Sequence, residues 1–223
     1  MKVHDGLVFA MAMQPRYHLV TMFHAVNLQG NQIAALLVAI SFAAGLNVYA
    51  TVATLGILAH ANLLQLPSGL HALADWWIIG ACLGLFAIEF VVDKIPVVDL
   101  MWNALHTFVR VPVAALLAFG ATSQLSPLKQ MLATIIGGAI ALAAHGSKTA
   151  LRAVVTPSPE PLSNTALSLG EDVLAVGLTW FATAHPYSAA VLVLLFLTII
   201  AVLIRKVSRA LGMMFRSSKL SLL

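Results

Sequence analysis

Residues 88–110 read IEFVVDKIPVVDLMWNALHTFVR, and this stretch decides the class of the protein. Charge is costly in hydrocarbon, and only 9% of the 223 residues are charged while 61% are hydrophobic. Charged side chains gathered in so few places are therefore our first candidates for function. Five of them lie here, among apolar runs of the kind that cross a bilayer: Glu89, Asp93, Lys94, Asp99 and Arg110.

The whole chain is too apolar for a soluble domain of its length, because its mean hydropathy is +0.96 and a soluble surface needs far more charge. A helix needs roughly 20 apolar residues to cross a hydrocarbon core about 30 Å thick, and its backbone must satisfy its own hydrogen bonds. We therefore predict an all-α, polytopic membrane helix bundle with about six transmembrane helices. The predicted spans are residues 33–60, 74–92, 99–121, 130–152, 166–184 and 187–204.

Lysine and arginine set the predicted orientation, since short cytoplasmic loops of membrane proteins hold an excess of both. One side of the predicted bundle collects all of these residues except Lys129 and the mid-span Arg110, so both termini are predicted to be cytoplasmic. We divide the chain into an N-terminal interfacial or cytoplasmic segment (1–30), a transmembrane helix bundle (31–205) and a basic cytoplasmic tail (206–223). A basic tail beside a membrane is explained more simply by binding to anionic lipid headgroups than by binding to nucleic acid. The expected partners therefore include membrane lipids and no nucleic acid.

The second and third spans hold the first group of candidate site residues. Glu89 and Asp93 are four residues apart and share a helix face, where they could bind a cation or relay protons, and Asp99 follows just beyond Pro96. Arg110 lies eleven residues after Asp99, about 16 Å along a helix and near mid-bilayer. It should face the interior and pair with Glu89, Glu171 or Asp172, either for function or as a purely structural ion pair.

The fourth and fifth spans hold the second group. His145, Lys148 and Arg152 fall within two turns and could grip an anionic group, although anchoring at the membrane surface also explains Arg152. Glu171 and Asp172 lie in the first turns of the fifth span, where the helix dipole favours acids. Facing the basic residues, they could form a charge network that opens when substrate or protons arrive.

Two further candidates lie outside these groups. Asn47, at mid-depth in the first span, needs a hydrogen-bond partner and is either a packing residue or a ligand of a transported solute. The small residues Ala44 and Gly45 beside it permit close helix packing. Glu160 lies in the proline-rich segment TPSPEPLSN, residues 156–164, which is either a loop that folds back against the bundle or a stiff connector. We assign Asn47 and Glu160 to the candidate pathway.

Signals of enzymatic chemistry are missing from the sequence. It has no HExxH metal helix, no GxSxG elbow and no Walker loop, and its eight histidines give no ligand pair within a span. Cys82 is the single cysteine, which excludes an intramolecular disulfide and a cysteine-based metal cluster. We predict no catalytic residues, no metal and no cofactor.

Three motifs carry a resemblance to a known family: AAGLNVYAT at 43–51, EFVVDKIPVVDLMW at 89–102 and SPEPLSN at 158–164. With them the chain resembles, over about residues 34–205, a bacterial family of small multi-pass membrane proteins, the domain of unknown function 4126. The resemblance implies a multi-pass protein of the bacterial inner (plasma) membrane. It implies no activity.

The leading functional hypothesis is a transporter or channel for a small solute or ion, whose charged residues line a polar cavity that opens to the cytoplasm. A chain this short is expected to need a homo-oligomer to enclose a pathway. The first alternative is a membrane-embedded lipid-handling enzyme, with His145 as base and Lys148 and Arg152 holding phosphate. The second is a non-catalytic scaffold whose ion pairs hold the helices in register.

Overall fold

The computed structural model describes residues 30–155 and 161–220. These residues form seven α-helices and one 3-10 helix, and no strand occurs among them. The all-α prediction is therefore confirmed. In chain order the elements are α3 (Gly30–Leu46), α4 (Val48–His60), η1 (Ser68–Ala74), α5 (Trp76–Val92), α6 (Pro96–Ala121), α7 (Pro127–Val155), α8 (Pro161–Ala184) and α9 (Pro186–Leu220).

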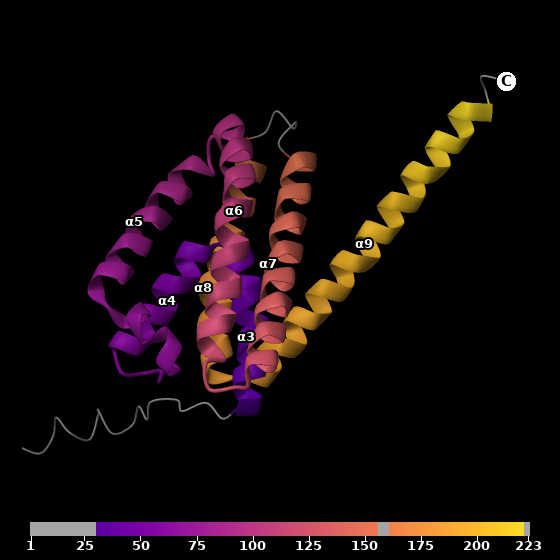
Figure 1. Ribbon diagram of the computed structural model, residues 1–223. Helices are drawn as coiled ribbons and strands as arrows, with labels where there is room; N and C mark the ends of the chain where they lie inside the picture. The colour runs from indigo at the N-terminus through magenta and orange to yellow at the C-terminus, as the bar shows by residue number, and fades with distance from the viewer. Residues whose placement is uncertain (1–29, 156–160, 221–223) are drawn as a thin grey trace, which may run out of the picture.

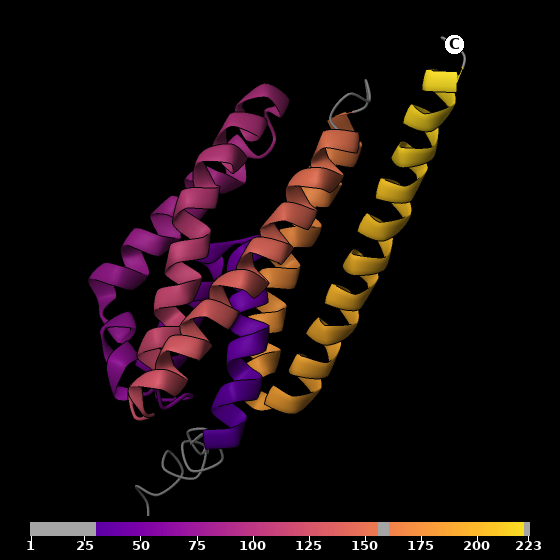
Figure 2. The same cartoon turned by 45° about the vertical axis from the view of Figure 1, so that its right-hand side comes forward.

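Helix α3 is the centre of the bundle and contacts α6, α7, α8 and α9. Helices α4 and α5 pack together on one flank, while α9 leans away from the other helices on the opposite flank (Figures 1 and 2). Every residue of α3 from Ala39 to Leu46 is buried. Small residues let α7 approach this core, because a Cβ added to Gly45 would lie 2.5 Å from the carbonyl oxygen of Ala141.

The outer surface of the bundle is apolar, as expected for contact with lipid. Phe108, near the middle of α6, is 81% exposed, and Val173 of α8 and Val191 of α9 are also exposed. In the described part of the chain, three helical segments are long and apolar enough to cross a membrane: Met101–Ala121, Pro127–Arg152 and Pro186–Lys206. A fourth is added if η1 and α5, which meet at 67°, count as one span. The structure is thus compatible with a membrane protein, and the prediction of six spans is not confirmed.

The predicted first span, residues 33–60, is wrong as a single helix. It divides at Asn47, whose φ of −148° and ψ of 104° are extended, into α3 and α4. Leu36 and Leu37, early in α3, line the same small cavity as Leu55 of α4. Helix α4 therefore runs obliquely back toward the end of the bundle at which α3 begins (Figure 1). The pair resembles a re-entrant hairpin with its turn inside the bundle.

Four other predicted spans start too late in the chain. Helix α6 begins at Pro96 and α8 at Pro161, before the predicted starts at residues 99 and 166. Proline is favoured in the first helical turn, because its missing N–H would be unpaired there and its φ is already helical. The same rule accounts for α7 and α9, which begin at Pro127 and Pro186.

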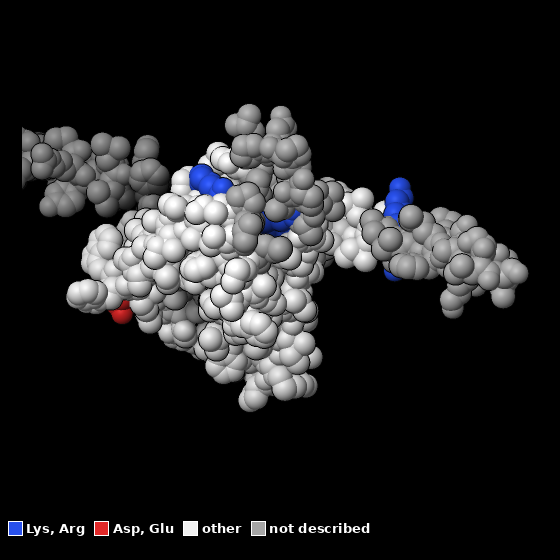
Figure 3. All heavy atoms as spheres, turned by 90° about the horizontal axis from the view of Figure 1, so that it is seen from above, with Lys and Arg blue, Asp and Glu red and all other residues white. Residues whose placement is uncertain are grey.

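The described helices begin and end at opposite ends of the bundle: α3 starts beside the α6–α7 connection, and α9 ends at the other end (Figures 1 and 2). The predicted cytoplasmic location of both termini is therefore not confirmed. Residues 1–29 and 221–223 lie outside the described part. Figure 3 looks onto the end that holds the α5–α6 connection. It shows basic atoms at the surface of the bundle, recessed basic atoms near its middle, basic atoms on α9 and very little acidic surface.

Candidate functional site

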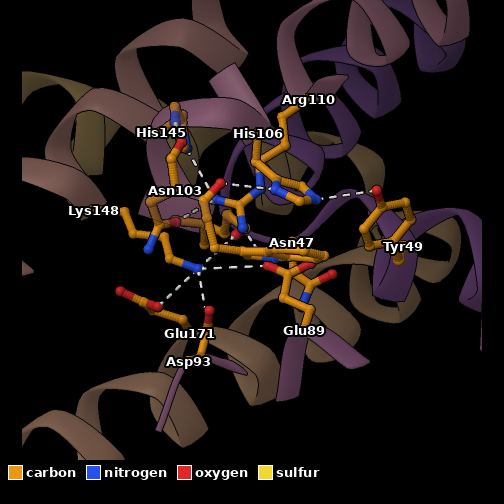
Figure 4. Close-up of polar contacts among 12 residues, drawn as sticks. Asn47, Tyr49, Glu89, Asp93, Asn103, His106, Arg110, His145, Lys148 and Glu171 are labelled. Atoms are coloured by element: carbon orange, nitrogen blue, oxygen red, sulfur yellow. Dashed lines mark hydrogen bonds and ion pairs between the residues drawn. The ribbon is translucent and has the colours of Figure 1, made fainter. Parts of the chain in front are cut away.

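Seven charged side chains meet inside the bundle, in a group that we name the buried charge cluster (Figure 4). They come from the end of α5, from α6, from α7 and from α8, and each residue is at most 7% exposed. All seven were predicted as site residues from the sequence. They are Glu89, Asp93, Arg110, Lys148, Arg152, Glu171 and Asp172.

Arg110 has three partners and no contact with solvent. One guanidinium nitrogen forms a salt bridge with Glu89, which is one of the three acids proposed for it. The other donates to Oδ1 of Asn103 at 3.2 Å and to Nδ1 of His145 at 2.9 Å. The guanidinium of Arg110 thus links α5, α6 and α7.

Lys148 lies at the centre of the cluster. Its Nζ is 3.1 Å from Oε2 of Glu171, 3.4 Å from Oδ2 of Asp93 and 3.8 Å from Oε1 of Glu89. It also donates to the carbonyl oxygen of Leu46 at 3.2 Å. That carbonyl belongs to the last residue of α3, where the break leaves backbone acceptors without helical partners and the helix dipole favours a cation.

Arg152 binds two of the same acids from the next turn of α7. Its Nη2 is 3.0 Å from Oδ2 of Asp93 and 2.5 Å from Oε2 of Glu171. Asp93 and Glu171 are therefore shared between Lys148 and Arg152. Sharing of this kind satisfies two buried cations and joins α5, α7 and α8 in one network.

Asn47 explains how a helix can break in this interior. Its Oδ1 accepts a hydrogen bond from the backbone N–H of Ala50 at 3.0 Å, so the side chain caps the start of α4. Its Nδ2 donates to Oδ1 of Asp172 at 2.9 Å. The Oδ2 of Asp172 is buried and has no hydrogen-bond partner among the described residues.

The histidines of the site act as neutral hydrogen-bonding groups. An arginine can only donate, so Nδ1 of His145 accepts from Arg110 and Nε2 carries the proton. Nε2 lies 3.1 Å from the carbonyl oxygen of Asn103 and 2.8 Å from the hydroxyl oxygen of Thr107. His106 donates from Nδ1 to the carbonyl of Trp102 at 2.8 Å and accepts from the Tyr49 hydroxyl at 3.1 Å.

Four residues of the site were not predicted from the sequence: Asn103, His106, Thr107 and Tyr49. A signal was available for two of them, because Asn103, His106 and Arg110 are spaced by three and four residues and share one face of α6. Lys148 and Arg152 stand in the same relation to His145 on α7. Two polar stripes on neighbouring helices indicate a shared polar interior.

Among the seven cluster residues, carboxyl groups outnumber cationic side chains by one. Glu89, Asp93, Glu171 and Asp172 are four carboxyl groups, whereas Arg110, Lys148 and Arg152 are three cations, and His145 is neutral. An unbalanced charge in a dry interior is costly. A proton or a cation bound among these seven residues would balance their charges.

In the described part of the chain, the charge cluster does not line an open polar cavity of the kind predicted. The charges pack against one another and are closed off from solvent, because ion pairing replaces the hydration that an open cavity would supply. A mostly apolar groove of about 430 Å³, between α3, α7, α8 and α9, has Lys148 and Glu171 in its lining. One side of the cluster, at Lys148 and Glu171, therefore borders this groove on the outside of the bundle.

Two proposed site residues are not placed by the structure. Glu160 and the side chain of Asp99 lie outside the described residues, although the backbone of Asp99 is part of α6. Among the residues that are described, no group of three or more histidine, cysteine, aspartate or glutamate side chains is arranged to hold a metal ion.

The fold and the cluster define a helical protein with membrane-compatible surfaces and a charged interior. The chain belongs to the family described as a domain of unknown function, DUF4126, whose family model matches residues 34–206. All seven residues of the buried charge cluster fall within the matched region. Neither a curated protein nor a solved structure matches the chain.

Proposed function

We propose that the protein is a small transporter or channel of the bacterial inner membrane, which moves a small solute or ion through a site built on the buried charge cluster. The observation that carries the proposal is the junction between a broken helix and that cluster. The carbonyl of Leu46, at the end of α3, binds Lys148, and Asn47, at the start of α4, binds Asp172.

A helix break is costly in a membrane interior, because each exposed backbone group needs a partner. Transporters place such breaks where the freed ends of two half-helices bind substrates and ions. Here α3 and α4 are 17 and 13 residues long and meet at one extended residue beside four carboxyl groups. This arrangement supports a binding function for the break.

The closed cluster fits an occluded state of such a transporter. The excess carboxyl group of the seven cluster residues favours uptake of a proton or a cation. Such uptake would change the ion pairs that hold α5, α7 and α8 together. We prefer transport to lipid chemistry, because Lys148 and Arg152 already bind carboxylates and both ring nitrogens of His145 are engaged. We also propose that the working unit is a homo-oligomer.

The test is proton and cation movement in liposomes that contain the purified protein and a trapped pH-sensitive dye. An imposed Na⁺ or K⁺ gradient is expected to change the dye signal faster than in protein-free liposomes. The triple variant Glu89→Gln, Arg110→Gln, Glu171→Gln should reduce the rate to that of protein-free liposomes. The matched control is Asp75→Asn, an exposed acid outside the cluster, which should keep the wild-type rate.

The second candidate is the scaffold, and the observation that favours it is the full burial of the Arg110–Glu89 pair. A scaffold would show no dye response above protein-free liposomes. If the protein is a scaffold, Arg110→Leu should lower the Tm, and neither the wild type nor the variant should show flux. A wild-type response that survives in a folded triple variant would equally reject transport through the cluster.

A further inference from the structure

We infer that the side chain of Asp172 carries a proton in this closed conformation, and that loss of the proton loosens the junction between α8 and the α3–α4 break. The inference rests on the proposed function and deepens it, because it assigns proton binding to one residue of the site. Two sets of contacts carry it, those of Asp172 and those of Asn47.

Asp172 differs from the other three acids of the buried charge cluster in its partners. Glu89, Asp93 and Glu171 each form a salt bridge with a lysine or an arginine. Asp172 forms none with a described residue, and its one hydrogen bond comes from the neutral amide of Asn47 at 2.9 Å. Since Asp172 is only 5% exposed, water does not replace the missing counter-ion.

The cap of α4 determines which oxygen of Asp172 holds the proton. Oδ1 of Asn47 accepts from the backbone N–H of Ala50, so Nδ2 of Asn47 is the atom that faces Asp172. Oδ1 of Asp172 is therefore an acceptor in either protonation state, and the proton lies on Oδ2. That oxygen is buried and has no hydrogen-bond partner among the described residues. A carboxyl group buried without a counter-ion takes up a proton, because an isolated charge costs far more than a neutral O–H.

The charged groups around Asp172 do not supply the counter-ion. Lys148 attracts its carboxylate from a distance, but the Lys148 ammonium group is held 3.1 Å from Glu171 and 3.2 Å from the carbonyl oxygen of Leu46. Two carboxylates of α5 repel Asp172. The charged groups that face it from α5, α6, α7 and its own helix are Glu89, Asp93, Arg110, Lys148, Arg152 and Glu171.

Loss of the proton would act directly on the helix break. The O–H bond of the carboxyl group breaks, the proton passes to water, and a carboxylate without a counter-ion remains. It can gain a partner by drawing Lys148 away from the carbonyl of Leu46, or it can move toward water and leave Asn47. Either movement removes a bond that closes the break.

Infrared difference spectra of the full-length protein in liposomes at neutral pH test for the proton. The wild-type spectrum minus that of Asp172→Asn should contain the carbonyl band of a protonated carboxyl group. Asp75→Asn, which changes an exposed acid, is the matched control, and its subtraction should give no such band. A first difference without the band, or a band in both differences, overturns the inference.

Two neighbouring acids should respond in opposite ways when each is neutralised. Asp172→Asn keeps the acceptor for Asn47 and places an N–H donor where the carboxyl group has its O–H, so its Tm should stay within about 2 °C of the wild type. Glu171→Gln removes a carboxylate that Lys148 and Arg152 share, and it should lower the Tm by about 6 °C or more. Failure of Asp172→Asn to fold, or a loss as large as that of Glu171→Gln, contradicts a neutral Asp172.

Backbone hydrogen exchange tests the release of the break. The N–H of Ala50 is held by the Asn47 cap, and wild type and Asp172→Asn are compared at the same pH, where the intrinsic exchange rates are equal. The segment 47–53 should exchange alike in both proteins at about pH 6, and faster in the wild type by about threefold or more at about pH 9. Equal exchange at both pH values would show that the proton does not control the break.

These measurements are independent of flux. A protonated Asp172 in a protein without flux would retain this inference and remove the transport proposal. Flux through a protein that lacks the infrared band would retain transport and remove only this inference.

Discussion

At the scale of single residues, the cost of burying charge governs this protein. A charged group loses its hydration on entering a dry interior and recovers that free energy only through close partners. Glu89 and Arg110 are fully buried and form an ion pair. Glu89 also lies near Lys148, and Arg110 also contacts His145. Each partner is therefore needed mainly because the other is present.

This dependence predicts non-additive effects on stability. Arg110→Leu or Glu89→Leu alone leaves an uncompensated buried charge and should lower the free energy of unfolding by about 3–5 kcal/mol. The double variant removes both charges and should lose much less than the sum of the two. Thermal or denaturant unfolding of the four proteins in detergent measures the coupling. Additive losses would show that Glu89 and Arg110 do not depend on one another.

At the scale of helices, the break at Asn47 could not be predicted from the sequence. Residues 33–60 contain no proline and read as one long apolar helix. The break is stable because partners distant in the chain meet it: Asp172 binds the Asn47 amide, and Lys148 binds the carbonyl of Leu46. Only the folded bundle brings these groups to residue 47.

The charged residues were easier to identify from the sequence than the break. Arg110, Glu171 and Lys148 are conspicuous because each stands in or beside an apolar run. Their contacts could not be predicted, since Arg110 had three possible acidic partners and helix order in a bundle does not follow from periodicity. The uncharged residues Asn103 and Tyr49 gave a weaker signal, because isolated polar residues are common in membrane helices.

The break itself can be tested with two asparagines. Asn47→Ala removes the cap of α4 and leaves Oδ1 of Asp172 without its donor, so it should cost roughly 2–3 kcal/mol of stability. Asn31→Ala is the matched control: Asn31 is exposed, makes one local bond to Gln32, and should cost well under about 1 kcal/mol. Equal effects on unfolding would mean that Asn47 does not hold the break together.

At the scale of the whole molecule, the hairpin of α3 and α4 changes the expected topology. If α4 returns to the side from which α3 enters, the described chain starts and ends on opposite sides (Figure 1). Exposed aromatic side chains agree with a membrane interface at the starting side: Trp76, Trp77 and Tyr187 lie at the first residues of α5 and α9 there. Lysine and arginine favour the other side as cytoplasmic, since Lys94 follows the end of α5 and Arg152 lies in the last turn of α7.

Site-directed labelling can decide between a hairpin and a crossing. In a Cys82→Ala background, which has no other cysteine, single cysteines are placed at the exposed residues Asn31, Gln65 and Ile95. We predict that a membrane-impermeant maleimide added to intact cells labels Asn31→Cys and Gln65→Cys, because in the hairpin arrangement both residues lie on the side opposite the basic helix ends. Ile95→Cys should react only after the membrane is permeabilised, and the parent variant should not react at all. Labelling of Asn31→Cys and Gln65→Cys from opposite sides would show that α3 and α4 cross the membrane as one span, and the break at Asn47 would then be a kink within that span.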